Sequence, residues 1–154
     1  MRIRLHRPDE RSGLLELWER SVRATHDFLT EADIAFYRPL VVGYLAGEGL
    51  ELYVVAGDDD VPMGFLGVVG SAIDALFLDP ACRGRGVGRR LVDHAQRLRP
   101  GALTVDVNEQ NREACRFYEG LGFHVIGRSP SDGNGRPYPL LHMRREAPAE
   151  AVSP

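Results

Sequence analysis

Residues 76–91, which read LFLDPACRGRGVGRRL, decide the fold of this chain. An apolar run ends at Asp79 and Pro80 and leads into a turn with three glycines, a pattern that predicts a buried strand followed by a tight turn. From Val87 onward the apolar residues recur at helical spacing. The first N–H groups of a helix have no partner inside it, and together with the helix dipole they attract anions. The stretch therefore predicts a site for a phosphate-bearing ligand where the turn meets the helix.

The composition of the turn excludes two common classes of phosphate site. The Walker loop requires a lysine before its Ser or Thr, whereas all 19 Lys and Arg residues of this chain are arginines. The dinucleotide fingerprint requires a third glycine where Arg89 stands here, and the alternative frame places Leu91 there. The absence of lysine also excludes Schiff-base chemistry. A glycine turn on a solvated arginine face is the plain structural alternative to a ligand site.

Outside this stretch, hydrophobic periodicity and turn residues predict elements in the order βααβββαβαββ. We expect strands over residues 3–5, 51–56, 63–69, 74–78, 103–107, 124–128 and 139–144, and helices from Pro8 and over 30–45, 87–98 and 111–120. This order is typical of an α/β (α+β) fold with a mixed, mostly antiparallel central sheet of about seven strands flanked by four helices. Residues 1–145 are expected to form one domain, and residues 146–154, rich in Ala, Pro and Glu, a disordered tail.

Length, charge and cysteine content limit the classes of function. A chain of 154 residues is long enough for one core, and its net charge of −3 gives no overall attraction for nucleic acid. Two cysteines favour a reducing compartment over a disulfide framework. The N-terminus lacks a signal-peptide core, the weakly polar stretch 61–73 is too short for a membrane span, and no His pair has metal-binding spacing. We therefore expect a cytoplasmic protein with no metal, membrane or nucleic-acid partner.

The phosphate turn resembles a known family motif. Residues 83–88, Arg-Gly-Arg-Gly-Val-Gly, resemble motif A of the GNAT N-acetyltransferases, Q/R-x-x-G-x-G/A. Further along the chain, a second element of this family is matched by similar residues, namely Asn111, Ala114, Phe117-Tyr118 and Gly122-Phe123. Residues 24–29, 74–77, 107–111 and 137–141 are similar to segments of small single-domain bacterial members of this family. The resemblance, which spans residues 3 to 144, implies a transferase of the acyltransferase class.

The resemblance implies an acetyl-CoA site between the strand before the turn, which splays away in this family, and the next strand. The backbone of Leu76, Phe77 and Leu78 would bind the pantetheine arm, and one N–H would polarise the thioester carbonyl. The amides from Gly84 to Arg89 would hold the pyrophosphate, and Asn111, otherwise a helix cap, would contact the arm from the other side. The implied cofactor-binding set is Leu76, Phe77, Leu78, Arg83, Gly84, Arg85, Gly86, Val87, Gly88, Arg89 and Asn111.

The resemblance also implies direct attack by an amine on the thioester. Tyr118 matches the family tyrosine that protonates the departing thiolate, because a phenol is protonated at neutral pH; a packed aromatic is the structural alternative. Two residues are candidates for removing a proton from the amine: Asp74, the only carboxylate on its strand, and His26, in the loop between the first two helices. Plain surface residues are the alternative for both. Cys115 has no evident base partner, so we expect no acyl-cysteine intermediate.

The implied activity is transfer of the acetyl group to a primary amine, either of a small molecule or of a protein lysine or N-terminus. The helix 1–2 segment and the polar, glycine-rich loop 129–138 are expected to select the acceptor, and their residues do not choose among these classes. A non-catalytic CoA-binding regulatory module is the alternative, and a protein binding another phosphate at this turn is a third hypothesis. The sequence does not determine the oligomeric state, which is either a monomer or a homodimer.

Overall fold

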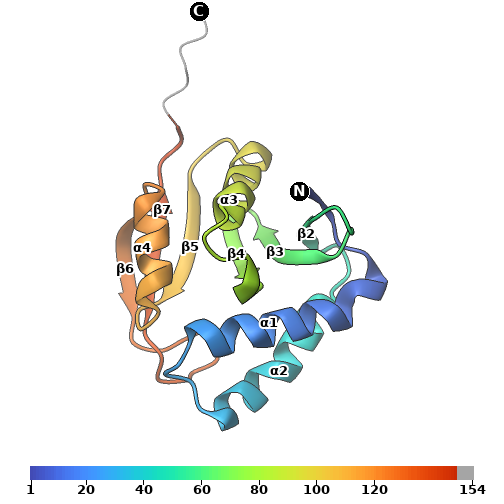
Figure 1. Ribbon diagram of the computed structural model, residues 1–154. Coiled ribbons are helices and arrows are strands. Elements are labelled where there is room, and N and C mark those ends of the chain that lie inside the picture. The colour runs from blue at the N-terminus through green and yellow to red at the C-terminus, as the bar shows by residue number, and fades with distance from the viewer. Residues whose placement is uncertain (149–154) are drawn as a thin grey trace, which may run out of the picture.

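The computed structural model describes residues 1–148, so residues 149–154 of the predicted tail lie outside the described residues. The elements follow the predicted order (Figure 1). The strands are β1 (Arg2–Leu5), β2 (Glu51–Ala56), β3 (Pro62–Val69), β4 (Ala72–Leu78), β5 (Leu103–Asn108), β6 (His124–Ser129) and β7 (Leu140–Arg145). The helices are α1 (Arg11–Thr25), α2 (Glu31–Leu45), α3 (Val87–Leu98) and α4 (Arg112–Gly120).

The helix starts follow from local sequence. Thr30 caps α2 by accepting a hydrogen bond from the Asp33 N–H, and the Asp33 carboxylate accepts from the Thr30 N–H in return. Asn111 caps α4 in the same manner through the Ala114 N–H. The helix expected from Pro8 instead begins as a 3-10 turn over Pro8–Glu10, and α1 follows it, because proline suits a first turn where its missing N–H is not needed.

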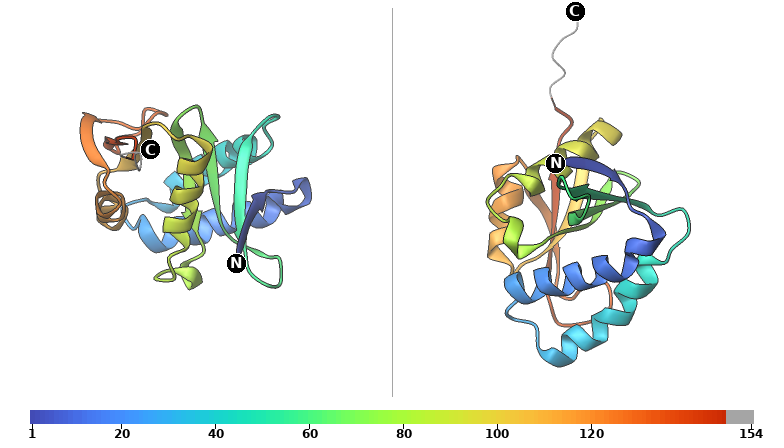
Figure 2. Two further views of the ribbon diagram at one scale, coloured as in Figure 1. Left: turned by 90° about the horizontal axis from the view of Figure 1, so that it is seen from above. Right: turned by 45° about the vertical axis from the view of Figure 1, so that its right-hand side comes forward.

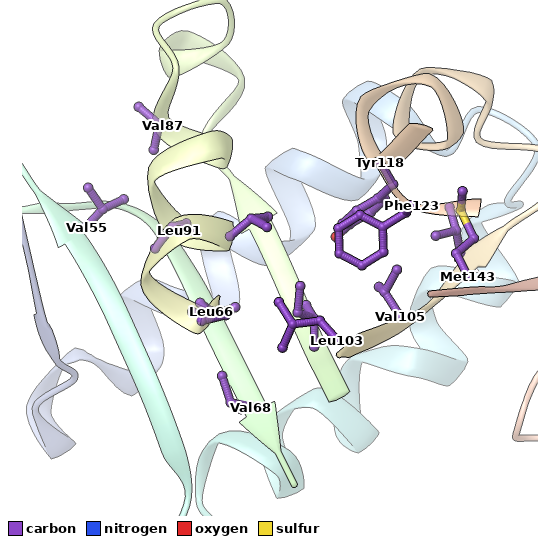
Figure 3. Close-up of a cluster of buried hydrophobic side chains, with 14 of the residues drawn as sticks. Val55, Leu66, Val68, Val87, Leu91, Leu103, Val105, Tyr118, Phe123 and Met143 are labelled. Carbon is purple, nitrogen blue, oxygen red and sulfur yellow. The ribbon is translucent and has the colours of Figure 1, made fainter. Parts of the chain in front are cut away.

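The seven strands form one sheet in the order β1-β2-β3-β4-β5-β7-β6, and only the β4–β5 pair is parallel. Two clusters of buried side chains lie on opposite faces. Helices α1 and α2, which lie side by side in Figure 2, pack with Leu52 and Phe65 on one face. Helices α3 and α4 pack with Val55, Leu66 and Met143 on the other face, as Figure 3 shows. The mixed, mostly antiparallel sheet flanked by four helices is confirmed.

The parallel pair is short, and it opens the sheet. Strand β4 pairs with β5 only at Ala72 and Ile73, although β4 continues to Leu78. The β3 register skips one residue at the same place, since Val68 faces Ile73 and Gly67 faces Ala75. Asp74 is therefore the extra residue of a β-bulge, a device that bends a strand and redirects a side chain. Beyond the bulge the two strands diverge, which is the predicted splay.

None of the described helices is both long and apolar enough to cross a membrane.

Candidate active site

A cavity of about 330 Å³ occupies the gap between the diverging strands. The end of β4 forms one wall, the start of α4 the opposite wall, and the phosphate turn and the end of α1 close its two ends. The lining residues are Ser21, Thr25, His26, Leu76, Phe77, Leu78, Cys82, Arg83, Gly84, Gly86, Val87, Gly88, Arg89, Asn111, Glu113, Ala114, Phe117 and Tyr118. This list contains every residue of the predicted cofactor-binding set except Arg85, together with His26 and Tyr118.

The phosphate turn is built to hold an anion with its backbone. Gly84 and Gly86 have φ values of 76° and 74°, a left-handed conformation that other residues adopt at a cost. Gly86 is the N-cap of α3, so the first amides of this helix stand free of intrahelical partners at the mouth of the cavity. Gly88 serves packing instead, since a Cβ there would lie 3.0 Å from Cζ of Phe117.

Arginine side chains add positive charge around the turn. Arg83 forms an ion pair with Glu113 of α4, which joins the two sides of the cavity mouth. Arg85 and Arg89 are exposed and have no carboxylate within ion-pair distance among residues 1–148. Arg85 lies in the turn but does not line the cavity, so it contributes only to the positive electrostatic potential around the turn. A turn with free amides and free guanidinium groups suits the pyrophosphate of a CoA molecule.

Asn111 caps α4, as one of its two predicted roles requires, and it also lines the cavity. Its Oδ1 accepts a hydrogen bond of 3.1 Å from the Ala114 N–H, which caps α4. The amide nitrogen, which remains a donor, points into the cavity and lies 3.5 Å from Nε2 of His26. Capping therefore aims the other half of the side chain at the inner end of the cavity.

Tyr118 lies on the same side of the cavity as Asn111. Tyr118 is 5% exposed, and its ring packs edge-on against Phe117 and Phe123. Figure 3 shows Tyr118 beside Phe123. Burial raises the pKa of its hydroxyl above the usual value, so the group stays protonated throughout the neutral range. Tyr118 is therefore both a packed aromatic residue and a lining residue of the first cavity.

Asp74 does not line this cavity. The bulge places it in a second cavity of about 200 Å³ on the α2 side of β4, lined by Trp18, Tyr37, Leu40, Val41, Tyr44, Phe65, Asp74, Ala75, Phe77 and Asn134. Phe77 lines both cavities, so this residue forms a wall that the two cavities share. The second cavity holds several aromatic rings and a single carboxylate, a combination that suits a cationic group on an apolar stem.

The sequence reasoning missed Tyr44 and Gly67, which shape the second cavity. The Tyr44 hydroxyl is shielded from solvent and has no partner of hydrogen-bond geometry among the described residues. Desolvation, followed by the nearby Asp74 charge, raises its pKa. The Tyr44 hydroxyl fits only because residue 67 is glycine, since a Cβ there would overlap the hydroxyl and lie 3.2 Å from Tyr44 Cζ. A glycine inside a strand is a signal of such a close approach, and β3 contains Gly67 as well as Gly64.

Gly67→Ala is expected to destabilise the fold by about 1–3 kcal/mol, because Tyr44 must move from a packed site. Tyr44→Phe removes the overlapping atom and an unpaired buried hydroxyl, so it should be close to neutral. The double variant should recover about 1 kcal/mol or more of the loss. Urea unfolding of the four proteins measures this coupling. Additive effects of the two substitutions would show that the hydroxyl does not require the glycine.

The loop between β6 and β7 is fastened over the second cavity. The Tyr37 hydroxyl donates a hydrogen bond to Asp132, and the Arg136 guanidinium lies 3.7 Å from the centre of the Phe36 ring. From the loop itself, the Tyr138 hydroxyl donates to Asp33 of α2. These contacts join two segments, α2 and the predicted acceptor loop, that are about 100 residues apart in the chain.

Cys115 lacks the features of a nucleophile. Cys115 is 9% exposed, and desolvation, followed by the charge of Glu119, raises its pKa above the usual value. Its thiol lies 3.7 Å from the Asn108 carbonyl oxygen, which cannot act as a base.

Among residues 1–148, no group of three or more His, Cys, Asp or Glu side chains is arranged to hold a metal ion.

Comparison with known proteins agrees with this geometry. The family model described as "Acetyltransferase (GNAT) domain" matches residues 49–125. The peptidyl-lysine N-acetyltransferase YjaB of Salmonella typhimurium is 48% identical over 141 residues, which is 92% of this chain and 95% of that protein. The protein of the same name from Escherichia coli K12 is 46% identical, over 92% of this chain and 94% of that protein.

Solved structures show the same fold. The solution structure of apo YjaB from Escherichia coli has a TM-score of 0.86 and 45% identity, covering 93% of this chain and 95% of that one. The structure of yncA from Salmonella typhimurium, solved with acetyl-CoA, has a TM-score of 0.67 and 20% identity, covering 100% of this chain and 98% of that one. Family model, relatives and cavity agree: the chain belongs to the GNAT acetyltransferases and transfers the acetyl group of acetyl-CoA to a primary amine.

Proposed function

We propose that this protein is a peptidyl-lysine N-acetyltransferase that acts in the cytoplasm. The observation that carries the proposal is that two cavities share Phe77 as a lining residue. One has the free amides and arginines that suit a CoA pyrophosphate. The other has aromatic walls and one carboxylate, which suit the alkyl stem and ammonium group of lysine. The two YjaB relatives carry this activity in their names, and two buried free cysteines suit a reducing compartment.

The residues of the first cavity divide the work of cosubstrate binding. The amides from Gly84 to Arg89 hold the pyrophosphate at the start of α3. The edge of β4 beyond the bulge has backbone groups that β5 does not pair. These groups bind the pantetheine arm, and one N–H at Leu76 or Phe77 stabilises the oxyanion. When bound, acetyl-CoA supplies an activated acyl group, and Tyr118 supplies the proton that neutralises its thiolate.

The residues of the second cavity position the acceptor. Asp74 attracts the ammonium group, and the rings of Trp18, Tyr37 and Phe77 surround the stem. When the amine is held next to the thioester, the reaction is faster, because a bimolecular step becomes effectively unimolecular. The loop with Asn134, fastened to α2, limits which acceptors enter.

The experiment that tests this function uses three peptides and acetyl-CoA, followed by mass spectrometry. One peptide has a blocked N-terminus and a single lysine, the second has arginine in place of that lysine, and the third has a free N-terminus and no lysine. We expect acetylation of the first alone. Because the chain contains no lysine, any acetyl-lysine must lie on the substrate. Modification of only the third peptide, or of spermidine alone, would overturn the proposal.

Asp74→Asn is expected to raise KM for the lysine peptide about 10-fold, because the amide retains the shape of the side chain but not its attraction for an ammonium group. The change in kcat should be smaller, since Asp74 lies outside the first cavity. Steady-state kinetics at low and high salt provide the measurement, and the difference should shrink at high ionic strength. Asp58→Asn, at an exposed turn, is the control for loss of one negative charge. Equal KM values for wild type and Asp74→Asn would contradict the assignment.

A further inference from the structure

His26 is held in one orientation at the inner end of the first cavity. Its Nδ1 lies 2.8 Å from Oγ1 of Thr25, the preceding residue. The Thr25 hydroxyl donates its own hydrogen to the Ser21 carbonyl oxygen, also at 2.8 Å. At the other side of the ring, Nε2 faces Nδ2 of Asn111 at 3.5 Å. Each of these neighbours has a defined donor or acceptor role.

Those roles determine which ring nitrogen carries the hydrogen. The Thr25 hydroxyl has one hydrogen, and the Ser21 carbonyl takes it, so toward His26 the hydroxyl can only accept. Nδ1 must therefore be the protonated nitrogen. Asn111 uses its oxygen to cap α4 and presents a donor toward Nε2, which agrees with a lone pair at that position. The imidazole thus directs an unprotonated nitrogen into the cavity.

The surroundings also keep the ring neutral. Desolvation lowers the pKa of His26 to about 4, and the charge of Asp27 opposes this effect only in part. On the cavity side, Tyr118 is protonated, and Glu113 is already paired with Arg83. Phe28 stacks between His26 and Tyr138 and separates the ring from the acceptor loop. Above about pH 5 the imidazole is therefore an available acceptor.

We propose that Nε2 of His26 takes the proton from the attacking amine, and that Thr25 is the positioning residue that fixes the required tautomer. This role rests on the proposed acetyl transfer. The positions of His26 and Asp74 distinguish the two candidates for the proton acceptor. His26 lines the cavity that contains Tyr118 and Asn111, whereas Asp74 is exposed in the second cavity, where it attracts the substrate.

The lysine ammonium loses one proton to solvent on entering, and its neutral nitrogen forms the N–C bond. Bond formation makes the two N–H groups left on this nitrogen strongly acidic, so even a weakly basic imidazole accepts one of these protons, and the other stays on the amide. As the C–S bond breaks, Tyr118 gives its proton to the sulfur. The imidazolium then returns its proton to the phenolate through water, which leaves the amide, the free thiol and both residues in their starting states.

The kinetic test compares variants along the Ser21–Thr25–His26 chain. His26→Gln is expected to lower kcat about 100-fold or more, in the range that general base groups contribute, with the affinity for CoA unchanged by calorimetry. Thr25→Val removes the hydroxyl at nearly constant shape and should lower kcat about 10-fold, and Thr25→Ser should restore it. His124→Gln, at an exposed site of β6, should match wild type. Full activity of His26→Gln would overturn the proposal.

A second measurement does not depend on activity. Long-range ¹H–¹⁵N NMR correlations of the folded protein should show His26 with hydrogen on Nδ1 and a bare Nε2 from pH 5 to pH 8, and Thr25→Val should shift the ring toward the other tautomer. A hydrogen on Nε2 in wild type would overturn the proposal even if peptides are acetylated. Failure of wild type to acetylate any lysine peptide, with the Nδ1–H tautomer present, would instead overturn the proposed substrate class.

Discussion

Gly86→Glu is expected to abolish CoA binding while leaving the fold intact. Gly86 lines the phosphate end of the cavity, and nothing lies within 4 Å of the Cβ that a side chain would add. The new carboxylate therefore enters the path of the pyrophosphate without striking the protein. This carboxylate repels the pyrophosphate, and it also neutralises Arg83 or Arg89, whose positive charges attract the pyrophosphate. We expect the Kd for CoA to rise at least 100-fold, or about 3 kcal/mol.

Isothermal titration calorimetry measures the loss, and two further variants separate its causes. Gly86 has a φ of 74°, so any side chain brings backbone strain of roughly 1–2 kcal/mol. Gly86→Ala carries the strain without the charge and should bind CoA with intermediate affinity. Gly49→Glu carries both, at a φ of 70° in an exposed turn away from the cavity, and should bind like wild type. Wild-type affinity in Gly86→Glu would place the phosphate site elsewhere.

Tyr118→Phe is the second substitution with a large expected effect, and it acts on kcat. The phenyl ring keeps the packing against Phe117 and Phe123, so stability and KM for acetyl-CoA should change little. The lost hydroxyl is the proton donor that we propose for the leaving sulfur. General acids of this kind contribute about 10²–10⁴-fold, and we expect a fall in kcat of at least 100-fold.

The pH dependence gives an independent check on Tyr118. Because burial raises the pKa of the hydroxyl above its usual value, the donor form persists as pH increases, and activity should not fall from this cause below about pH 10. Tyr53→Phe, on β2 against His94, is the matched control and should retain wild-type kcat. Wild-type kcat in Tyr118→Phe would reduce Tyr118 to a packing residue.

The order of elements and the cosubstrate side of the site were predictable because they depend on local signals. Glycine and proline mark the turns, Thr30 and Asn111 mark helix starts, and apolar spacing separates strands from helices. The phosphate turn is also local, since its amides become available wherever a helix begins after a flexible turn. Residues close together in the sequence therefore carried enough information to predict the fold and this end of the cavity.

The acceptor side was not predictable in the same way. Its walls come from α1, α2, β4 and the loop before β7, and packing alone brings them together. Tyr44 and Gly67 are unremarkable separately, and only their contact between α2 and β3 shows why residue 67 has no side chain. The roles of Asp74 and His26 were open for the same reason, since a carboxylate on a strand and a histidine in a loop have many uses.

The sequence by itself determined that this chain has a helix that starts after a glycine-rich turn, in a fold with a mostly antiparallel sheet, and that it contains no lysine of its own. Tertiary structure decided which proton acceptor candidate faces which cavity. A β-bulge at Asp74 turns that carboxylate toward α2 and parts β4 from β5, and the resulting gap receives His26 from the far end of α1. The physical reason is that a cavity is defined by surfaces that meet through packing, which no local pattern encodes.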